Sequence, residues 1–396
     1  LALKLVVEGI DPEALSAREK TPIGKIQAII HRAVDQGLLI APETKIVRTP
    51  NRYAAQSGGE PFLKSDVFTL QWHVTQACDL HCRHCYDRSD RTKMSFAEAR
   101  RILDDFFTFT QAMNVRGHIT FTGGNPLLYP DFSRLYKATS DLGFSAAILG
   151  NPASAGILSS LQDIQPMTHF QISLEGLETY NDYIRGQGHF KRSLAFLDIL
   201  REKNIYAMVM LTLNRDNMDQ VLPLAEVLRD RADSFTFNRL ALVGEGEALR
   251  LPDPGDFKAF LKDYAEATAS NPVLRLKDNL FNILKKDDDL PLFGGCTGHG
   301  CGAAFNFFSL LPDGEVYACR KFPSLIGSVN DQSLLDIYNG RQANLYRKGS
   351  EACSGCDLFN VCRGCPAVVY GMGLEPFSAR DPFCTYAGAP NLPVKS

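Results

Sequence analysis

Three cysteines on one short stretch constrain this chain more than any other feature of its sequence. Cys78, Cys82 and Cys85 are separated by three residues and then by two. Each iron of a cubane 4Fe-4S cluster takes one cysteine thiolate, so three cysteines hold such a cluster and leave one iron open. Zinc normally takes four ligands in two closely spaced pairs, which fits less well, although His81 or His84 could complete a zinc site.

Length and composition exclude several other classes of protein. A chain of 396 residues is long enough for two or three domains with ordinary cores, so a disulfide framework is not needed. A hydrophobic fraction of 45% with 22% charged residues is typical of globular proteins. The net charge of −3 and the scattered basic residues argue against nucleic acid as a partner. No apolar run reaches the roughly 18 to 20 residues of a membrane span.

The start of the chain and its cysteine content bear on the compartment. Residues 1–10 include Lys4 and Glu8 and lack a small-residue cleavage site, so we do not expect a secretory signal. The chain starts with Leu1 rather than Met, which is compatible with a longer natural N-terminus. We expect a cytoplasmic location, where the 11 cysteines stay reduced and are more suited to ligating metal than to pairing.

Residues 1–60 are predicted to form a small domain. Thr21 is placed to cap a helix whose apolar periodicity ends at Gly37, and residues 38–40 and 45–48 are predicted to be two strands. A helix followed by a two-stranded wing resembles a winged helix-turn-helix module. An N-terminal cap on the rest of the protein is the simpler alternative, and the nearly balanced charge disfavours DNA binding. The polar segment 51–61 is predicted to be a linker.

From residue 67 the pattern alternates between strands and helices. Ser95 is predicted to cap the first helix of this series, which runs to Met113. Strands are predicted at 67–75, 118–121, 146–149, 168–174, 206–213 and 234–238, and helices at 95–113, 130–142, 190–203 and 219–230. Six parallel strands imply an α/β fold, a partial (β/α)6 TIM-like barrel whose ligand site lies at the C-terminal ends of the strands.

Short polar motifs follow these strands in order. Gly123-Gly124-Asn125-Pro126 follows the second strand, Gly150-Asn151-Pro152 the third, and Ser173-Leu174-Glu175-Gly176 the fourth, and Arg185 opens a glycine-containing turn further on. Together with the cysteine triplet, this order resembles the radical S-adenosylmethionine (SAM) superfamily. In that family the open iron is chelated by the amino and carboxylate groups of SAM, whose reductive cleavage yields a 5′-deoxyadenosyl radical.

The resemblance implies roles for individual residues at these strand ends. Gly123, Gly124 and Asn125 stand where the family has Gly-Gly-Glu-Pro, which holds the amino group of SAM; Asn125 departs from the family's acid. Asn151 would lie near the adenosine. The remaining residues that the resemblance assigns to SAM are Ser173 and Glu175 for the ribose and methionine, Arg185 for the carboxylate, and His84 beside the adenine.

The last third of the chain is dense in cysteine. It contains Cys296, Cys301, Cys319, Cys353, Cys356, Cys362, Cys365 and Cys384, and Asp313-Gly314 predicts a hairpin just before Cys319. This arrangement resembles the SPASM domain, although x2 replaces the usual x3 before Cys365. The resemblance implies two auxiliary 4Fe-4S clusters, one on Cys296, Cys301, Cys319 and Cys365 and the other on Cys353, Cys356, Cys362 and Cys384. With the triplet, these assignments use all 11 cysteines.

The resulting domain prediction is 1–60 for the winged-helix-like domain, 66–245 for the radical SAM barrel, 246–290 for linker helices and 291–390 for the SPASM domain. Relatives of this kind modify peptides, so the resemblance implies hydrogen abstraction from a ribosomal precursor peptide and formation of a thioether or other cross-link. It also implies that residues 1–60 bind the leader of that peptide, and that flavodoxin or ferredoxin donates electrons.

Some subfamilies fit less well than others. Sulfatase maturases place an Asp base after the cysteine equivalent to Cys319, where this chain has Arg320, and epimerases need a spare cysteine. Tetrapyrrole processing stays open, and overall resemblance points to a selenobiotic or thio(seleno)oxazole maturase. Candidates for a catalytic role are Arg320 and Asp313, with Glu175 and Lys321 also worth testing. An alternative of another class is a structural metal-binding interaction module.

Overall fold

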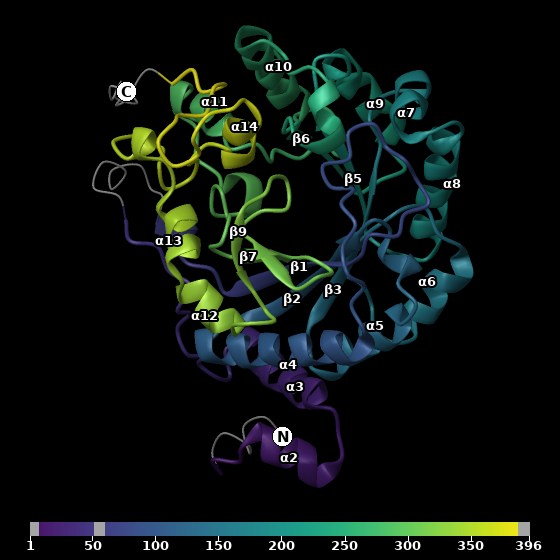
Figure 1. Cartoon of the computed structure of the whole chain (residues 1–396), viewed down its shortest axis with the longest axis vertical. Coiled ribbons are helices and arrows are strands. Elements are labelled where there is room, and N and C mark those ends of the chain that lie inside the picture. Colours follow the sequence, from purple (N-terminus) through teal and green to yellow (C-terminus); the bar gives the residue numbers. More distant parts are fainter. Residues whose placement is uncertain (1–7, 51–59, 387–396) are drawn as a thin grey trace.

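The centre of the protein is one curved sheet of nine strands, seen in the computed structural model, which describes residues 8–50 and 60–386 (Figure 1). The strands are β1 (Val67–Thr75), β2 (Arg116–Gly123), β3 (Ser145–Leu149), β4 (Phe170–Ser173), β5 (Ala207–Leu213), β6 (Ser234–Arg239), β7 (Phe307–Leu310), β8 (Glu315–Tyr317) and β9 (Leu325–Ser328). Their order across the sheet is β6-β5-β4-β3-β2-β1-β7-β8-β9. Strands β1 to β6 are parallel, which confirms the predicted barrel sheet.

Helices cover the outer face of this sheet (Figure 1). Those of the barrel are α4 (Phe96–Met113), α5 (Phe132–Asp141), α6 (Ala155–Gln162), α7 (Glu178–Arg185), α8 (His189–Glu202) and α9 (Val221–Leu228). The later ones are α10 (Pro254–Ala267), α11 (Phe281–Asp287), α12 (Leu334–Asn339), α13 (Arg341–Lys348) and α14 (Pro366–Gly371). Helices α6 and α7 are too short to show a clear apolar period, and the sequence did not predict them.

Helix α4 shows how local sequence and packing agree. Ser95 and Glu98 form a reciprocal capping box, as predicted for the start of this helix. Its buried face carries Phe106 and Phe109, and the ring of Phe109 packs edge-on against Phe68 of β1 with centroids 4.7 Å apart. Burying such a side chain contributes about 1.5–3 kcal/mol, so this face holds α4 against the start of β1.

The cysteine-rich third of the chain continues the barrel sheet. Strand β7 pairs in parallel with β1, with Thr69 opposite Phe307 and Trp72 opposite Leu310, and the predicted hairpin then leads into β8. Gly314 sits at the turn with a φ of +89°, a backbone conformation that side-chain-bearing residues rarely adopt. The C-terminal region is therefore joined to the barrel by backbone hydrogen bonds as well as by side chains.

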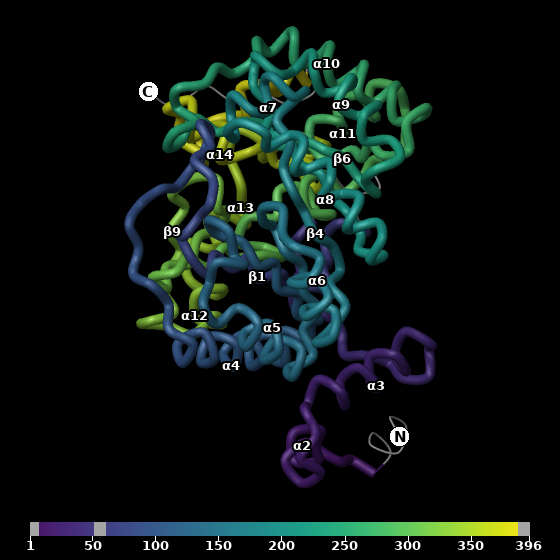
Figure 2. The backbone as a smooth tube through the Cα atoms, turned by 90° about the vertical axis from the view of Figure 1, so that its right-hand side faces the viewer, coloured from purple at the N-terminus to yellow at the C-terminus, as the bar shows by residue number. Residues whose placement is uncertain are grey.

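The N-terminal helices project from one end of the barrel, below α4 and α5 (Figures 1 and 2). They are α2 (Pro12–Glu19) and α3 (Ile23–Asp35). Gly24 of α3 lies against Gly143, at the end of α5, so closely that a Cβ on Gly24 would be 2.3 Å from the Gly143 nitrogen. Glycine at both positions lets the helix dock there.

The predicted wing does not form in the described residues. Residues 38–40 are not a strand, because the amides of Leu38 and Leu39 turn back to the Ala33 carbonyl at the end of α3. Residues 45–48 pair with 63–65 instead: Arg48 N donates to Leu63 O at 2.8 Å, and Ile46 is fully buried. Burial of the Ile46 side chain in the main core stabilises this pairing more than a local hairpin would be stabilised. Residues 51–59 of the predicted linker lie outside the described residues.

None of the helices in residues 8–50 and 60–386 combines the length and apolar character of a membrane span.

Candidate active site

A cavity of about 510 Å³ opens at the C-terminal ends of the parallel strands. Its walls include Thr122 at the end of β2, Ser173 of β4 and Thr212 of β5. The loop that follows β1 closes one side with Cys78, Cys82 and Cys85, so the structure brings the cysteine triplet to the edge where the parallel sheet predicted a ligand.

Polar side-chain donors approach two of the three thiols, and the third, Cys85, donates to the Asp87 carbonyl at 3.4 Å. Asn151 Nδ2 lies 3.7 Å from Cys78 Sγ, and Arg185 Nη1 lies 3.7 Å from Cys82 Sγ. Burial raises the pKa of the Cys82 thiol, and the nearby Arg185 opposes that shift. Within the described residues, no group of three or more His, Cys, Asp or Glu side chains is arranged to hold a single metal ion. A cubane differs from such a site because each of its irons takes a different sulfur.

Gly123, the last residue of β2, and Gly124, the next residue, pack against the segment that leads into the cysteine loop. A Cβ on Gly123 would lie 2.3 Å from the Thr75 carbonyl oxygen, and one on Gly124 would lie 2.2 Å from that of Ala77. Across this contact, Gly124 N donates to Thr75 O at 2.8 Å. The sequence predicted that these glycines allow close approach to a ligand; the described contacts show close approach to the backbone that leads into the triplet.

Asn125 is explained by a carboxylate that the sequence analysis missed. Asp79 Oδ1 accepts hydrogen bonds from Asn125 Nδ2 at 3.0 Å and from Asn151 Nδ2 at 2.6 Å. An acid at position 125 would meet Asp79 with like charge, whereas an amide donates to it. Asp79 follows Cys78 directly in the sequence. An acidic residue inside the cysteine triplet was therefore the sequence feature that could have indicated this contact.

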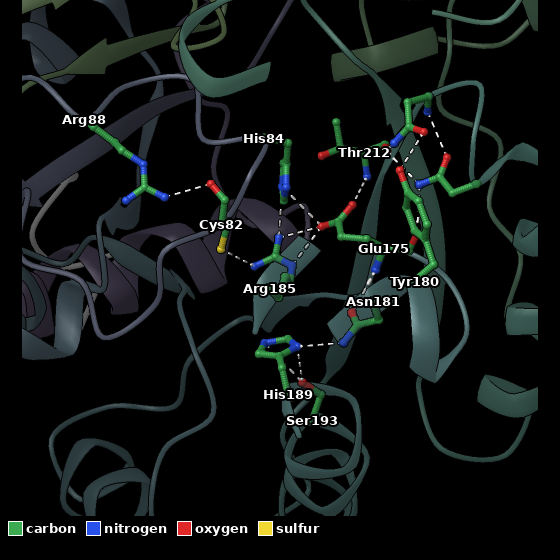
Figure 3. A network of polar contacts seen from close by, with 12 residues as sticks. Cys82, His84, Arg88, Glu175, Tyr180, Asn181, Arg185, His189, Ser193 and Thr212 are labelled. Carbon is green, nitrogen blue, oxygen red and sulfur yellow. Dashed lines mark hydrogen bonds and ion pairs between the residues drawn. The ribbon is translucent and has the colours of Figure 1, made fainter. Parts of the chain in front are cut away.

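Glu175 lies at the centre of a buried polar network (Figure 3). Its Oε1 accepts from Arg185 Nη2 at 2.6 Å and lies 3.4 Å from His84 Nε2, and its Oε2 accepts from Thr212 N at 2.8 Å. Burial opposes the charged form, but nearby His84 and Arg185 together with the Thr212 amide hold the pKa of Glu175 below its ordinary value. Glu175 therefore acts as an anionic anchor that directs Arg185 toward Cys82.

The turn after Arg185 is built by buried polar residues that the sequence analysis did not single out. Asn181 Oδ1 accepts from Glu175 N at 3.1 Å (Figure 3). Asp182 accepts from the amides of Gly188 at 2.6 Å and Phe190 at 2.9 Å. These bonds fix the glycine-containing turn and so position Arg185.

His84 has an unsatisfied ring nitrogen. Its Nδ1 is buried and has no hydrogen-bond partner in the part of the chain that the structure describes, while Nε2 lies near Glu175 and Arg185. Burial lowers the pKa of His84 to about 4, so the ring is neutral at pH 7. A buried nitrogen without a partner usually meets a ligand or water, and His84 also lines the cavity.

The C-terminal cysteines fall into two groups. Burial raises the pKa of Cys301 to about 12, and Cys365, Cys296 and Cys319 lie near enough to raise it further. Burial likewise raises the pKa of Cys353 to about 12, with Cys384 and Cys356 adding to the shift, and Cys362 is influenced by Cys384 and Cys353. The neighbours within each group belong to the same one of the two sets that the resemblance to the SPASM domain implies. As ligand sets they stay predictions.

Of the four candidates for a catalytic role, three lie at or beside the cavity. Arg320 and Lys321 line it, and the buried Glu175 lies directly behind its Arg185 wall. Asp313 does not line it: at the hairpin turn, its Oδ2 accepts from Arg91 Nη1 at 2.6 Å. Asp313 therefore lies behind Asp87, which lines the cavity and accepts from the same Arg91, and its catalytic role stays a prediction.

Comparison with known proteins bears directly on this arrangement. The Radical SAM superfamily profile matches residues 72–228, and the SPASM profile, an iron-sulfur cluster-binding domain, matches residues 301–366. These matches show that the chain contains a radical SAM domain and a SPASM domain. These two domains imply a SAM-binding 4Fe-4S cluster in the barrel and auxiliary clusters in the C-terminal region.

Several named relatives share this architecture. AdoMet-dependent heme synthase from Methanosarcina barkeri is 22% identical over 80% of this chain and 96% of its own. Mycofactocin maturase MftC from Mycobacterium ulcerans is 28% identical over 82% of this chain and 89% of its own. Streptococcus suis SuiB, in its structure with the precursor peptide SuiA, shares the fold with a TM-score of 0.62 at 17% identity, covering 92% of this chain and 90% of SuiB. SuiB has also been solved with S-adenosylmethionine bound.

The residues of this chain suit the cofactors that its domains imply. Cys78, Cys82 and Cys85 supply three sulfurs at the cavity wall, and hydrogen-bond donors approach two of these sulfurs. The free Nδ1 of His84 and the Arg185 guanidinium offer polar contacts to a ligand beside them. A thiol that coordinates iron loses its proton outright, so the raised pKa values do not oppose ligation.

Proposed function

We propose that this protein is a peptide maturase that abstracts a hydrogen atom from a ribosomal precursor peptide and so forms a thioether or other cross-link. The observation that carries the proposal is the cavity, which the cysteine triplet borders on one side and Arg320 and Lys321 of the SPASM region on the other. When bound there, a 4Fe-4S cluster and SAM would supply a 5′-deoxyadenosyl radical that takes the hydrogen atom, and an auxiliary cluster of the SPASM region would accept the electron left over when the cross-link forms.

The chain's own residues bind and orient in this scheme. Cys78, Cys82 and Cys85 hold the cluster, and Gly123 and Gly124 let their loop pack against β2. Arg185, held by Glu175, faces the cavity as the partner for the carboxylate of SAM. The sheet and the SPASM region both line the cavity in which the reacting carbon would lie.

A peptide substrate is supported by the relatives. MftC is named a maturase, and SuiB has been solved with the precursor peptide SuiA. The structure of anSMEcpe with AdoMet and the Cp18Cys peptide also shares the fold, with a TM-score of 0.59 at 16% identity. The proposal of a selenobiotic or thio(seleno)oxazole maturase rests on overall sequence resemblance alone.

Residues 1–60 are proposed to hold the leader of that peptide. Without a wing, the available surface is a groove of about 890 Å³ between the N-terminal helices and the barrel, lined by Ile30 and Val34 of α3, by Phe107 of α4 and by Leu39 and Ile40. Ile40 is 99% exposed, which is unusual for a large apolar side chain. An Ile40→Ser variant should raise the KM for a leader-bearing peptide and leave that for its leaderless core unchanged. Equal effects on both peptides would contradict the assignment.

Tetrapyrrole processing is the second candidate function, because the heme synthase of Methanosarcina barkeri aligns with this chain over 96% of its own length. The two functions are separable with one enzyme preparation. The reconstituted protein is incubated without oxygen with SAM and dithionite, and either a precursor peptide or an iron porphyrin bearing propionates is added. The maturase proposal expects peptide-dependent 5′-deoxyadenosine and transfer of deuterium from labelled peptide into it. Deuterium transfer from the porphyrin alone would favour the alternative.

If the protein were instead a structural metal-binding interaction module, the same preparation would behave differently. A radical enzyme should contain iron and sulfide, absorb broadly in the visible range and form 5′-deoxyadenosine. A colourless zinc protein would exclude the enzyme. In the iron-containing protein, a Cys82→Ala variant that still cleaved SAM would contradict the assignment of the triplet.

A further inference from the structure

The cavity wall carries an excess of positive charge. Among the described residues that line the cavity, Asp87 is the only acid, and its Oδ2 already accepts from Arg91 at 3.1 Å. The cations of the same lining are Arg88, Arg185, Arg239, Arg320 and Lys321.

Three of these five cations have carboxylate partners within the protein. Arg185 pairs with Glu175 at 2.6 Å, and Arg88 lies 3.6 Å from Glu245. Arg239 is almost fully buried and is bonded to two acids, Asp278 at 2.7 Å and Asp381 at 2.7 Å. Their charge is therefore balanced before any ligand binds.

Arg320 and Lys321 have only neutral acceptors in the part of the chain that the structure describes. Arg320 Nη1 donates to Thr122 Oγ1 at 3.2 Å, and its guanidinium lies 5.9 Å from the centre of the Tyr86 ring. Lys321 Nζ donates to the backbone oxygen of Arg239 at 3.3 Å. Both side chains are partly buried, so water screens their charge less than it would on an open surface.

A partly buried lysine, Lys277, lies behind this pair. Lys277 Nζ donates to Asn238 Oδ1 at 2.7 Å, and Asn238 itself lines the cavity. Burial lowers the pKa of Lys277, and the neighbouring Cys296 and Cys319 thiols oppose the smaller lowering by Lys321 and Arg320, so Lys277 lies between the cysteines and these two cations. Cations gathered in this way at a ligand cavity favour an anionic ligand.

We propose that Arg320 and Lys321 together bind a carboxylate of the substrate, so that this maturase acts on a peptide with an acidic group beside the carbon that is attacked. The carboxylate belongs to an aspartate or glutamate side chain or to the C-terminus of the peptide. A guanidinium offers several donors in a fixed plane and does not lose its proton in proteins. Arg320 is therefore a binding residue and not a general base.

Two other anions compete for the same charge. The carboxylate of SAM is one, although Arg185 beside the cysteine loop is its proposed partner. The auxiliary cluster on Cys319 is the other, since Lys321 lies near that thiol. Arg320, in contrast, reaches Thr122 at the end of β2, on the barrel side of the cavity. The inference rests on the proposed peptide function, and its test separates both competitors.

The experiment measures the binding of short peptides to the anaerobically reconstituted full chain with SAM present. The probes are N-acetyl-Gly-Glu-Gly-amide, its Gln counterpart, and N-acetyl-Gly-Gly-Gly as free acid and as amide, followed by ligand-observed NMR. The variants are Arg320→Gln, Lys321→Gln and the double variant. Lys262→Gln, on the exposed side of α10, is the matched control.

We expect the wild type to bind one acid probe about tenfold more tightly than its amide, because a charge-assisted bond replaces a neutral one. The probe that shows this preference tells whether a side chain or a chain end is recognised. The double variant should lose the preference, and Lys262→Gln should keep it. Iron content, visible absorbance and SAM affinity should stay at wild-type values in the double variant.

Equal binding of acid and amide by the wild type would overturn the inference, as would a preference that survives in the double variant. A fall in SAM affinity in the double variant would assign the cations to the cofactor, and a loss of iron would assign them to the cluster. Absence of 5′-deoxyadenosine from the wild type would instead count against the radical function itself.

Discussion

The buried ion pair between Glu175 and Arg185 makes a sharp prediction for a Glu175→Ala variant. The side chain of Glu175 is 1% exposed and that of Arg185 is 10% exposed, so water cannot replace the lost partner. Removing one member of a buried pair costs about 3–5 kcal/mol, because the other charge stays buried. The same substitution frees the Thr212 amide, which donates to Glu175 Oε2 at 2.8 Å.

The Thr212 amide allows this cost to be measured locally. A hydrogen bond to a charged group contributes about 1.5–3 kcal/mol, and each 1.4 kcal/mol is about tenfold in a local opening equilibrium. Hydrogen exchange at Thr212 should therefore be about 10- to 100-fold faster in Glu175→Ala. Glu175→Gln keeps one acceptor oxygen and should give a smaller increase.

A matched control is Glu178, the first residue of α7. Glu178 pairs with Lys191 at 2.9 Å, but the two side chains are 45% and 76% exposed. Solvent screens such a pair, so Glu178→Ala should leave exchange at Thr212 unchanged. Wild-type exchange at Thr212 in Glu175→Ala would refute the reasoning that Glu175 anchors this side of the cavity.

Three further predictions concern the glycine contact, Asp79 and acid stability. Gly124→Ala places a Cβ 2.2 Å from the Ala77 oxygen and should lower the amount of iron bound after reconstitution. Gly156→Ala in α6, where the nearest atom to the new Cβ is 4.0 Å away, should leave the iron content unchanged. Equal iron content in the two variants would contradict this prediction. Asp79→Asn removes the negative charge that accepts hydrogen bonds from the Asn125 and Asn151 amides. This variant should bind SAM more weakly in equilibrium dialysis. Asp79→Glu, which keeps the charge, is the control. Burial and the neighbouring His169 lower the pKa of His118 from 6.5 to about 4. Between these pH values His118 is protonated in the unfolded chain and neutral in the folded protein. The free energy of unfolding therefore falls as the pH drops from 6.5 toward about 4. His118→Gln should reduce the difference between urea midpoints at pH 7 and pH 5, and an unchanged difference would show that another group is responsible.

Local patterns in the sequence determined the barrel and the order of the polar motifs at its strand ends. The period of apolar residues located the six parallel strands, and the positions of Gly124, Asn151 and Glu175 just after strands placed them at one edge of the sheet. These features could be read because helix and strand periods and turn residues depend on neighbours in sequence. The triplet of cysteines is local for the same reason.

Only the tertiary structure decided which distant segments meet. Strand β7 pairs with β1 although about 240 residues separate them, and residues 45–48 pair with 63–65 rather than forming a wing. The bonds from Asn125 and Asn151 to Asp79 are of the same kind. Such contacts depend on the burial and hydrogen bonding of the whole chain, which no local window contains.

The charge of the cavity is the clearest case of this difference. The sequence shows 42 basic and 45 acidic residues and gives no hint of a local excess of either sign. Folding pairs Arg185 and Arg239 with acids and leaves Arg320 and Lys321 with neutral acceptors at the same cavity. Composition determines the net charge of a protein, but only the packed structure decides which charges remain available to a ligand.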